Sequence, residues 1–267
     1  MINRRAVLAL PAAAAAALTV AGAVGTAAGT AAVARPVARL ADLSKQSPID
    51  VRRHLIRRRP GLPTLRVHYP ASTPVSVRYV RKDDTSPGGC SARGTQETEE
   101  IDVEPGVAWV RLDGVRYDLA QFHFHTPSEH TIAGRHAPLE IHLVHADADG
   151  RRLVVSVLTF PGRRREVDRL LRRLPEECAD PVEVADLDLG RLLPKDPTTL
   201  RYRGSLTTDP YTEDVQWLLT VPSTASRRGI AAFRSLFPDG DSRDAQPLHG
   251  RHLMSDGPWW AAAQRYL

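Results

Sequence analysis

The chain has 267 residues, of which 42% are hydrophobic and 25% charged, and its formal net charge is +5. A chain of this length and apolar content can bury a full core, so we expect one large domain. The charge is only mildly basic. Arginine runs such as Arg57-Arg58-Arg59 and Arg163-Arg164-Arg165 have no aromatic residues among them, so solvated faces are favoured over nucleic-acid contacts.

Residues 1–34 stand apart in composition. Arg4-Arg5 precedes an alanine-rich apolar run and then Ala32-Val33-Ala34, a signal-peptidase cleavage pattern. The paired arginines resemble a twin-arginine export signal, which predicts an exported mature chain of residues 35–267, periplasmic or extracellular. An uncleaved anchor is the alternative, because the run could span a bilayer, as no other stretch could. Cleavage would remove two arginines and no acid, lowering the net charge from +5 to +3.

The mature sequence predicts many strands and few short helices. After an irregular lead-in, residues 82–99 are polar with three glycines and predict an exposed loop, and Asp113-Gly114 predicts a tight hairpin turn. Residues 257–260 are expected to form a packed or partly exposed tail. Strands are predicted at 64–69, 75–80, 100–103, 107–112, 116–125, 153–160 and 214–221, and amphipathic helices at 164–174 and 224–237. The predicted class is a mainly β domain.

Cys90 and Cys178 are the only cysteines. In an exported protein they could form one disulfide. Two free thiols are the alternative, and the sequence leaves both open.

Two alternating stretches carry the chemistry. His123 and His125 alternate with phenylalanines, so both imidazoles point to one face of a strand. Residues 139–145 alternate too, which places His142 beside Glu140 and Val144 on one face. If the two strands pair, three imidazoles meet and a fourth position stays open, which is the arrangement that catalytic zinc needs.

Neighbouring polar residues favour a metal over a purely structural histidine cluster. A metal-bound imidazole normally donates its other N–H to a second acceptor. Gln121 and Glu140 lie two residues from His123 and His142, on the same faces, and are therefore the expected acceptors. Zinc is the favoured ion, because imidazole suits it and no thiolate is near.

Four separated segments follow one another in the chain: Gln46-Ser47-Pro48-Ile49-Asp50, Gln121 to His130, Glu140-Ile141-His142-Leu143-Val144-His145 and Gly204-Ser205-Leu206-Thr207-Thr208. Ala245-Gln246-Pro247-Leu248 is a weaker fifth, and together they span residues 46–248. In these segments and their order the chain is similar to the α-class carbonic anhydrases of the bacterial, exported type. The resemblance implies a large twisted, mostly antiparallel sheet with Zn²⁺ bound by His123, His125 and His142.

The same resemblance implies reversible hydration of carbon dioxide to hydrogencarbonate and a proton by zinc-bound hydroxide. Thr207 and Glu129 would orient the hydroxide, and Gln121 and Glu140 would hold the ligand histidines. Neither nucleic acid nor, after signal cleavage, a membrane is an expected partner, and the sequence predicts no oligomeric state. The residues implied to contact the substrate are Val144, Leu206, Thr208 and Trp217, with Val155 or Val157 beside them.

The chain also departs from the family pattern. Residues 94–99 read Gly-Thr-Gln-Glu-Thr-Glu and lack the family's proton-shuttle histidine, so we expect weakened proton transfer, with Glu97 or buffer substituting poorly. The family's aromatic segment before Gln46 is almost absent. Asp209-Pro210-Tyr211 stands where exported members often carry a cysteine, so a Cys90–Cys178 bond would be a different disulfide.

Two other functions compete with the enzyme. A catalytically weak, carbonic anhydrase-related binding module is one, although such relatives normally lose a zinc-ligand histidine and all three are present here. A cupin-type metalloenzyme is the other, and it would want a glutamate ligand and glycine-rich motifs around the histidine pair.

Overall fold

A computed structural model describes residues 45–81, 97–176 and 179–267. The predicted signal, Cys90, Cys178 and most of the predicted loop 82–99 lie outside these ranges. The strands are β1 (Asp50–Val51), β2 (Ile56–Arg58), β3 (Arg66–His68), β4 (Thr73–Arg81), β5 (Glu97–Asp102), β6 (Trp109–Leu112), β7 (Val115–His125), β8 (Thr131–Ile132), β9 (Arg135–His136), β10 (Leu139–Ala146), β11 (Arg152–Pro161), β12 (Val182–Leu187), β13 (Thr199–Ser205), β14 (Glu213–Thr220), β15 (Ser223–Ala225) and β16 (Leu253–Ser255). The α-helices are α1 (Val167–Leu170), α2 (Arg227–Leu236) and α3 (Trp259–Ala263), and the 3₁₀ helices are η2 (Arg53–Leu55), η4 (Leu189–Leu192) and η5 (Gln264–Tyr266).

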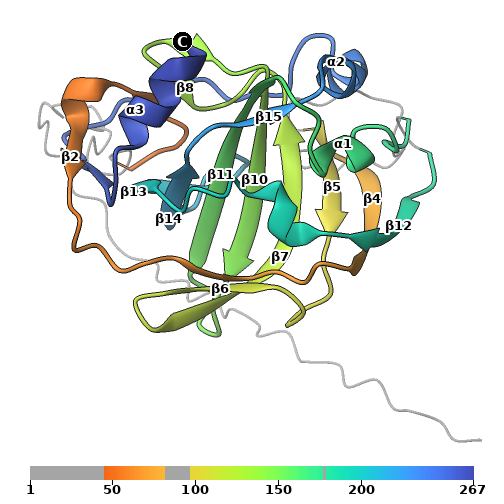
Figure 1. Ribbon diagram of the computed structural model, residues 1–267, viewed down its shortest axis with the longest axis horizontal. Helices are drawn as coiled ribbons and strands as arrows, with labels where there is room; N and C mark the ends of the chain where they lie inside the picture. Colours follow the sequence, from red (N-terminus) through yellow and green to blue (C-terminus); the bar gives the residue numbers. More distant parts are fainter. Residues whose placement is uncertain (1–44, 82–96, 177–178) are drawn as a thin grey trace, which may run out of the picture. The chain divides into compact units, whose positions relative to one another are not determined.

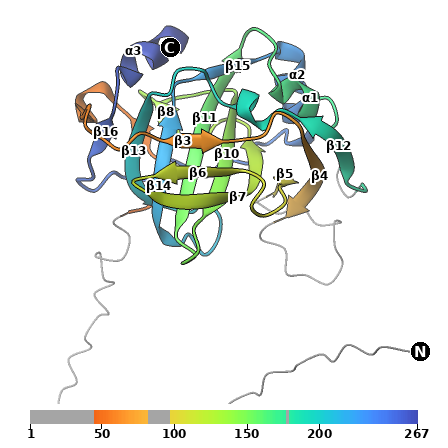
Figure 2. The same ribbon diagram turned by 60° about the horizontal axis from the view of Figure 1, so that its bottom comes forward.

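One 13-stranded sheet carries most of the described chain, in the order β12-β4-β5-β7-β10-β11-β14-β13-β16-β2. Strand β15 pairs with β11, and β3 and β6 extend from β7 as a separate branch (Figure 2). Most neighbours are antiparallel, and β11–β14, β11–β15 and β16–β2 are parallel. The mainly β class with a mostly antiparallel sheet is therefore confirmed. A second, three-stranded sheet has the order β1-β8-β9.

Alternation along the central strands produces an apolar core on each face of the sheet. Phe122, Phe124 and Leu143 belong to one core, which also contains side chains of α1 and α2; the ring of Phe124 lies 5.5 Å from that of Phe233 on α2. Val144 and Trp217 belong to the other core. Figure 1 shows β7, β10 and β11 side by side at the middle of the sheet. Where both faces of a strand are buried, polar side chains are stable only if they have hydrogen-bond partners. The histidines of β7 and β10 meet this condition through the hydrogen bonds described below.

The predicted turn between β6 and β7 is present. Asp113 has φ 49° and Gly114 φ 78°, so both central residues adopt the left-handed conformation that a two-residue hairpin of this type requires. Among the non-glycine residues, aspartate is one of those that tolerate it.

Two predictions about elements are wrong. The helix expected over 164–174 closes only as Val167–Leu170, although its apolar side chains are buried as expected. The carboxylate of Asp168 accepts the backbone N–H groups of Arg165 and Ser226, which fixes this single turn against the start of α2. Residues 97–99 begin strand β5 rather than ending a loop. The tail expected at residues 257–260 is packed, with Trp259 fully buried at the start of helix α3.

Candidate metal centre

Strands β7 and β10 pair antiparallel with His142 directly opposite His123, as the two alternating stretches predicted. Paired residues of antiparallel strands share a face, so His123, His125 and His142 converge. The ring centroids lie 5.0 Å (His123–His125), 5.3 Å (His123–His142) and 4.8 Å (His125–His142) apart. One nitrogen from each ring lies within 4.8 Å of the others, and the three side chains are buried. This set of converging donor atoms holds three imidazoles and no carboxylate.

The opposite nitrogen of each ring is occupied by a hydrogen bond. His123 Nδ1 donates to Gln121 Oε1 at 2.9 Å, and His142 Nε2 donates to Glu140 Oε1 at 2.9 Å. His125 Nδ1 donates to the main-chain oxygen of Asp241 at 3.0 Å. These bonds set the tautomers so that Nε2 of His123, Nε2 of His125 and Nδ1 of His142 turn inward as acceptors.

The site fits a metal ion on two observations. His125 Nε2 is buried without any hydrogen-bond partner, and such an orphaned atom is costly unless another group satisfies it. Burial lowers the pKa of His142 to about 4, which the charge of Glu140 only partly opposes, so this ring is neutral at pH 7 as a metal ligand must be. Neutral imidazoles without a nearby thiolate are a zinc-type donor set.

A second set of converging donors, His130, Glu140 and His142, is a hydrogen-bonded network. Glu140 Oε1 accepts from His130 Nδ1 at 2.7 Å and from Ser156 Oγ at 2.6 Å, besides His142. Burial would raise the pKa of Glu140, but the adjacent His130 and His142 hold the pKa well below its usual range. The nitrogen and oxygen atoms that converge in this set already hydrogen-bond to one another, so this set needs no metal ion to satisfy them.

Glu129 and Thr207 lie next to the imidazoles. Burial raises the pKa of Glu129 to about 8, the charge of Glu140 adds to this, and a hydrogen bond from the Thr207 side chain opposes it. Oε2 of Glu129 lies 3.7 Å from His125 Nε2 and 3.8 Å from His142 Nδ1.

Three of the four expected substrate residues lie together on the face of the sheet that carries the imidazoles. Val144 and Trp217 belong to one core, Leu206 packs against it, and the Trp217 ring centroid lies 4.9 Å from that of His142. Thr208, two residues beyond Leu206, is partly exposed, and its carbonyl accepts from Tyr211 N.

The placement of Val155 or Val157 on this wall is wrong. Both belong to the core on the opposite face, because alternation puts odd-numbered residues of β11 there. Val154, paired directly with Val144 and Trp217, occupies the wall instead.

Sequence reasoning missed the support supplied by distant segments. Asp241, whose carbonyl orients His125, comes from a loop after α2. Arg243 in the same loop donates from Nη1 to Gln46 Oε1 and to the Ser47 carbonyl, and from its backbone N–H to Glu129. A main-chain acceptor has no side-chain signature, so no sequence pattern could have pointed to Asp241.

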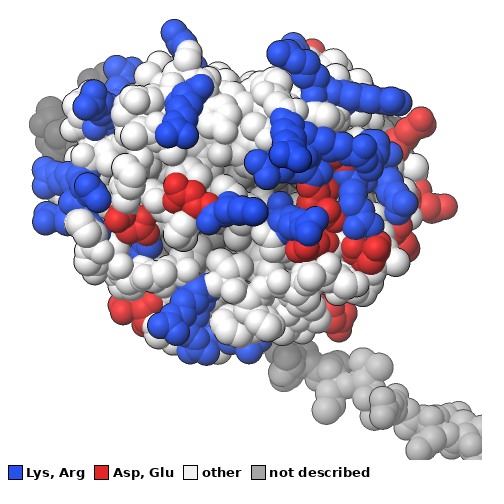
Figure 3. Space-filling model, in the orientation of Figure 1, with Lys and Arg blue, Asp and Glu red and all other residues white. Residues whose placement is uncertain are grey.

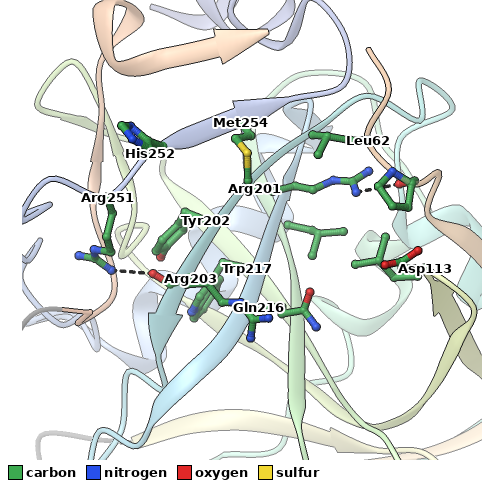
Figure 4. A pocket seen from close by; sticks show the side chains of 13 residues that line it. Leu62, Asp113, Arg201, Tyr202, Arg203, Gln216, Trp217, Arg251, His252 and Met254 are labelled. Carbon is green, nitrogen blue, oxygen red and sulfur yellow. Dashed lines mark hydrogen bonds between the residues drawn. The ribbon is translucent and has the colours of Figure 1, made fainter. Parts of the chain in front are cut away.

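A separate pocket of about 480 Å³ is lined by residues of β13 and β14 and by Arg251, His252 and Met254 (Figure 4). Arg201 pairs directly with Leu218 across the two strands, and Arg203 pairs with Gln216. Trp217, whose ring centroid lies 4.9 Å from that of His142, also lines this pocket. None of the three imidazoles is among the described residues that line it.

Comparison with known proteins agrees with this geometry. The profile of the eukaryotic-type carbonic anhydrases matches residues 36–256. A carbonic anhydrase of Klebsiella pneumoniae is 40% identical over 148 residues, covering 54% of this chain and 60% of that protein, and thus less than two thirds of the relative's length. A carbonic anhydrase of Pectobacterium carotovorum is 33% identical over 192 residues, covering 68% of this chain and 78% of the relative.

Solved structures show the same fold. The α-carbonic anhydrase of Thermovibrio ammonificans, in complex with the inhibitor sulfanilamide, superposes with a TM-score of 0.67 at 33% identity, covering 79% of this chain and 87% of that one. The Photobacterium profundum α-carbonic anhydrase gives 0.66 at 30% identity, covering 79% and 89%. The family profile spans most of the chain, including the three histidines, and the chain belongs to the eukaryotic-type (α) carbonic anhydrase family.

Proposed function

We propose that this protein is a zinc-dependent carbonic anhydrase that interconverts carbon dioxide with hydrogencarbonate and a proton. The observation that carries the proposal is the convergence of three buried imidazoles, each oriented by its own hydrogen bond. Relatives named carbonic anhydrase share the family with this chain and support it.

His123, His125 and His142 would hold the ion, and zinc would supply a Lewis acid that makes water nucleophilic near neutral pH. Around it, Gln121, Glu140 and the Asp241 carbonyl keep the three rings in place. Such supporting groups typically change metal affinity or activity by about 10- to 100-fold when removed.

Thr207 and Glu129 would align the attacking nucleophile. The Thr207 hydroxyl would donate a hydrogen bond to Glu129, so towards the nucleophile it could act only as an acceptor. That restriction fixes which lone pair faces the carbon atom of the substrate, which is a positioning effect rather than proton abstraction. Carbon dioxide, being uncharged, would lie against the wall formed by Val144, Leu206 and Trp217, with Thr208 at its more open side.

The main test is zinc content and carbon dioxide hydration on the purified mature chain. We expect one zinc per chain and hydration that a sulfonamide inhibits, measured by stopped flow. Zinc without hydration would favour the related binding module over the enzyme. A bound redox metal in place of zinc would favour the cupin-type reading.

The role of Thr207 has its own test. Replacing Thr207 with Ala should lower kcat/KM by about 100-fold, because misplacement of a reacting group costs about that much, while the zinc content stays unchanged. Thr207→Ser keeps the hydroxyl and serves as the matched control, with activity within several-fold of the wild type. Equal activity of the alanine and serine variants would reject the alignment role.

Proton release is proposed to be slow. No histidine occurs in residues 94–99, of which 94–96 lie outside the described ranges and Glu97 begins β5. Turnover should therefore rise with buffer concentration. A fast turnover that does not respond to buffer would contradict this proposal.

Export is proposed from residues 1–34, which lie outside the described ranges. Replacing both Arg4 and Arg5 with Lys should retain the full-length chain in the cytoplasm when a cell is fractionated, and unchanged export would reject a twin-arginine route. Among the described residues, no helix has the length and apolar character to cross a membrane.

A further inference from the structure

A strongly basic hollow lies away from the metal centre. It has a volume of about 800 Å³ and is formed by the connection from β11 to α1, together with η4 and the residues that follow it. Its single acid is Glu166. The six cations that line it are Arg163, Arg164, Arg165, Arg169, Arg191 and Lys195.

Two of the six cations are neutralised by carboxylates. Arg169 pairs with Glu166 at 2.8 Å and with Asp186 at 2.5 Å. Arg191 pairs with Asp188 at 3.0 Å. These two guanidinium groups therefore contribute little net positive charge to the hollow.

The other four cations have no carboxylate partner within the described parts of the chain. They are the exposed side chains of Arg163, Arg164, Arg165 and Lys195. Within the described residues, the one side-chain hydrogen bond that any of these four cations makes is a long one, 3.5 Å, from Arg165 Nε to the Thr224 hydroxyl. Like charges that line one hollow repel one another, so binding an anion there would lower the free energy.

The hollow is formed by two segments that the fold brings together, and the arginine run is only one of them. Lys195 belongs to the segment after η4, which lies more than twenty residues further along the chain than the run from β11 to α1. Figure 3 shows Lys and Arg side chains crowded over the half of this face that carries α1 and α2 in Figure 1, with acidic side chains among them and beside them.

The backbone beneath the cations is fixed. Arg165 N donates to Asp168 Oδ2 at 2.8 Å, Gly162 N donates to the Ala225 carbonyl at 2.9 Å, and the Arg163 carbonyl accepts from the Thr224 hydroxyl at 3.0 Å. On the other side, Leu189 and Leu192 of η4 are buried. The site thus presents exposed charged ends on a hydrogen-bonded backbone, so binding an anion does not have to order the main chain as well.

We propose that this hollow binds a soluble oligophosphate, a short chain of linked phosphate groups. Guanidinium groups remain charged at any physiological pH and match phosphate oxygens with paired N–H donors. A single exposed ion pair contributes only about 0–1 kcal/mol, so one phosphate would bind weakly, whereas several linked phosphates can engage several cations at once. The concave shape and the lack of aromatic lining residues disfavour nucleic-acid bases.

Isothermal titration of the zinc-loaded mature chain with sodium tripolyphosphate tests the proposal. We expect tripolyphosphate to bind at least about tenfold more tightly than orthophosphate at low salt, and the affinity to fall as salt screens the charges. No measurable tripolyphosphate binding at low salt would overturn the proposal. Binding to phosphatidylglycerol vesicles without binding to tripolyphosphate would overturn it as well, because the surface would then recognise a membrane.

Charge-removal variants locate the binding. The double variant Arg163→Ser/Arg164→Ser should weaken tripolyphosphate binding by at least about tenfold, and Lys195→Ser should weaken it by about threefold, since the two segments act together. The double variant Arg57→Ser/Arg59→Ser removes the same charge from exposed positions in and after β2 and should change the affinity less than about twofold. An equal loss in the control pair, or no effect of Lys195→Ser, would show that the hollow is not the site.

All altered side chains are exposed, so the fold should be retained. Unchanged zinc content, melting temperature and carbon dioxide hydration of each variant verify this. The hydration arm also separates the two proposals, because the hollow shares no residue with the metal centre.

Discussion

At the scale of single residues, buried carboxylates in this protein differ according to their partners. Glu140 is fully buried and accepts hydrogen bonds from His130, His142 and Ser156, so it is held as an anion. Glu99 is also 0% exposed, but neither of its carboxylate oxygens has a hydrogen-bond partner among the described residues. Burial raises the pKa of Glu99 to about 8, so it is held as the neutral acid at pH 7.

This difference predicts a pH dependence of stability. The pKa of Glu99 is about 8 in the folded chain and has its ordinary value of 4.5 in the unfolded chain. Between pH 4.5 and pH 8, Glu99 is therefore protonated when the chain is folded and ionised when it is unfolded. Unfolding then releases a proton, so the contribution of Glu99 is fully present below pH 4.5 and is lost as pH rises to 8. The slope is at most about 1.4 kcal/mol per pH unit.

Glu99→Gln removes the ionisation and should remove this slope. Urea unfolding at several pH values between 5 and 8.5 would show the variant gaining stability relative to the wild type as pH rises. Glu104→Gln changes the same charge at an exposed position and should leave the pH dependence unaltered. Parallel pH profiles for the wild type and Glu99→Gln would contradict the prediction.

At the scale of elements, alternation predicted the metal face well because it has a direct physical cause. The central strands β7 and β10 are buried on both faces, so their side chains must alternate between a histidine face and an apolar face. The same rule corrects the valine assignment, since Val155 and Val157 have the wrong parity.

The elements that escaped prediction are those whose pattern was broken by partnered polar groups. In β13, Arg201 is buried because it donates to Thr199 and forms an ion pair with Asp256 at 2.6 Å, so the strand does not read as apolar. In α1, Asp168 is buried by its bonds to Ser226 and Arg165. Of these partners, Asp256 and Ser226 come from distant parts of the chain, and the local sequence does not reveal them.

Strand β13 also carries a prediction of its own at Gly204, where its register with β14 shifts. A Cβ atom at this position would lie 2.0 Å from Ser47 Oγ and 2.9 Å from atoms of both Tyr202 and Trp217. Ser47 Oγ is bonded to the Tyr202 hydroxyl at 2.8 Å, so it cannot move without breaking that bond.

Gly204→Ala should therefore destabilise the fold by about 1–3 kcal/mol, the usual cost of overfilling a packed site. Urea unfolding at fixed pH measures it. Gly61→Ala is the control, because no atom lies within 4 Å of the added Cβ. Equal stability of the two variants would show that Ser47 has room to shift.

At the scale of the whole molecule, the metal centre depends on the fold more than the fold depends on the metal ion. The ligands lie on two adjacent strands of a 13-stranded sheet, and hydrogen bonds hold each ring by its outer nitrogen. Strand pairing and these hydrogen bonds hold the three histidines in place without a metal ion. The metal-free protein should therefore stay folded, while the buried Nε2 of His125 makes that state less stable.

Removing zinc with a chelator should lower the melting temperature by about 10 °C. Free zinc at a thousandfold excess over its dissociation constant stabilises the folded state by about 4 kcal/mol, and each kcal/mol corresponds to about 2–4 °C for a domain of this size. Circular dichroism melts with and without the chelator measure the shift, and His123→Ala should abolish it. His68→Ala, on the exposed strand β3, should keep the full shift. Complete unfolding on chelation would show that the fold requires the metal ion. A shift in melting temperature that persists in His123→Ala would show that the stabilising zinc binds somewhere other than the three imidazoles.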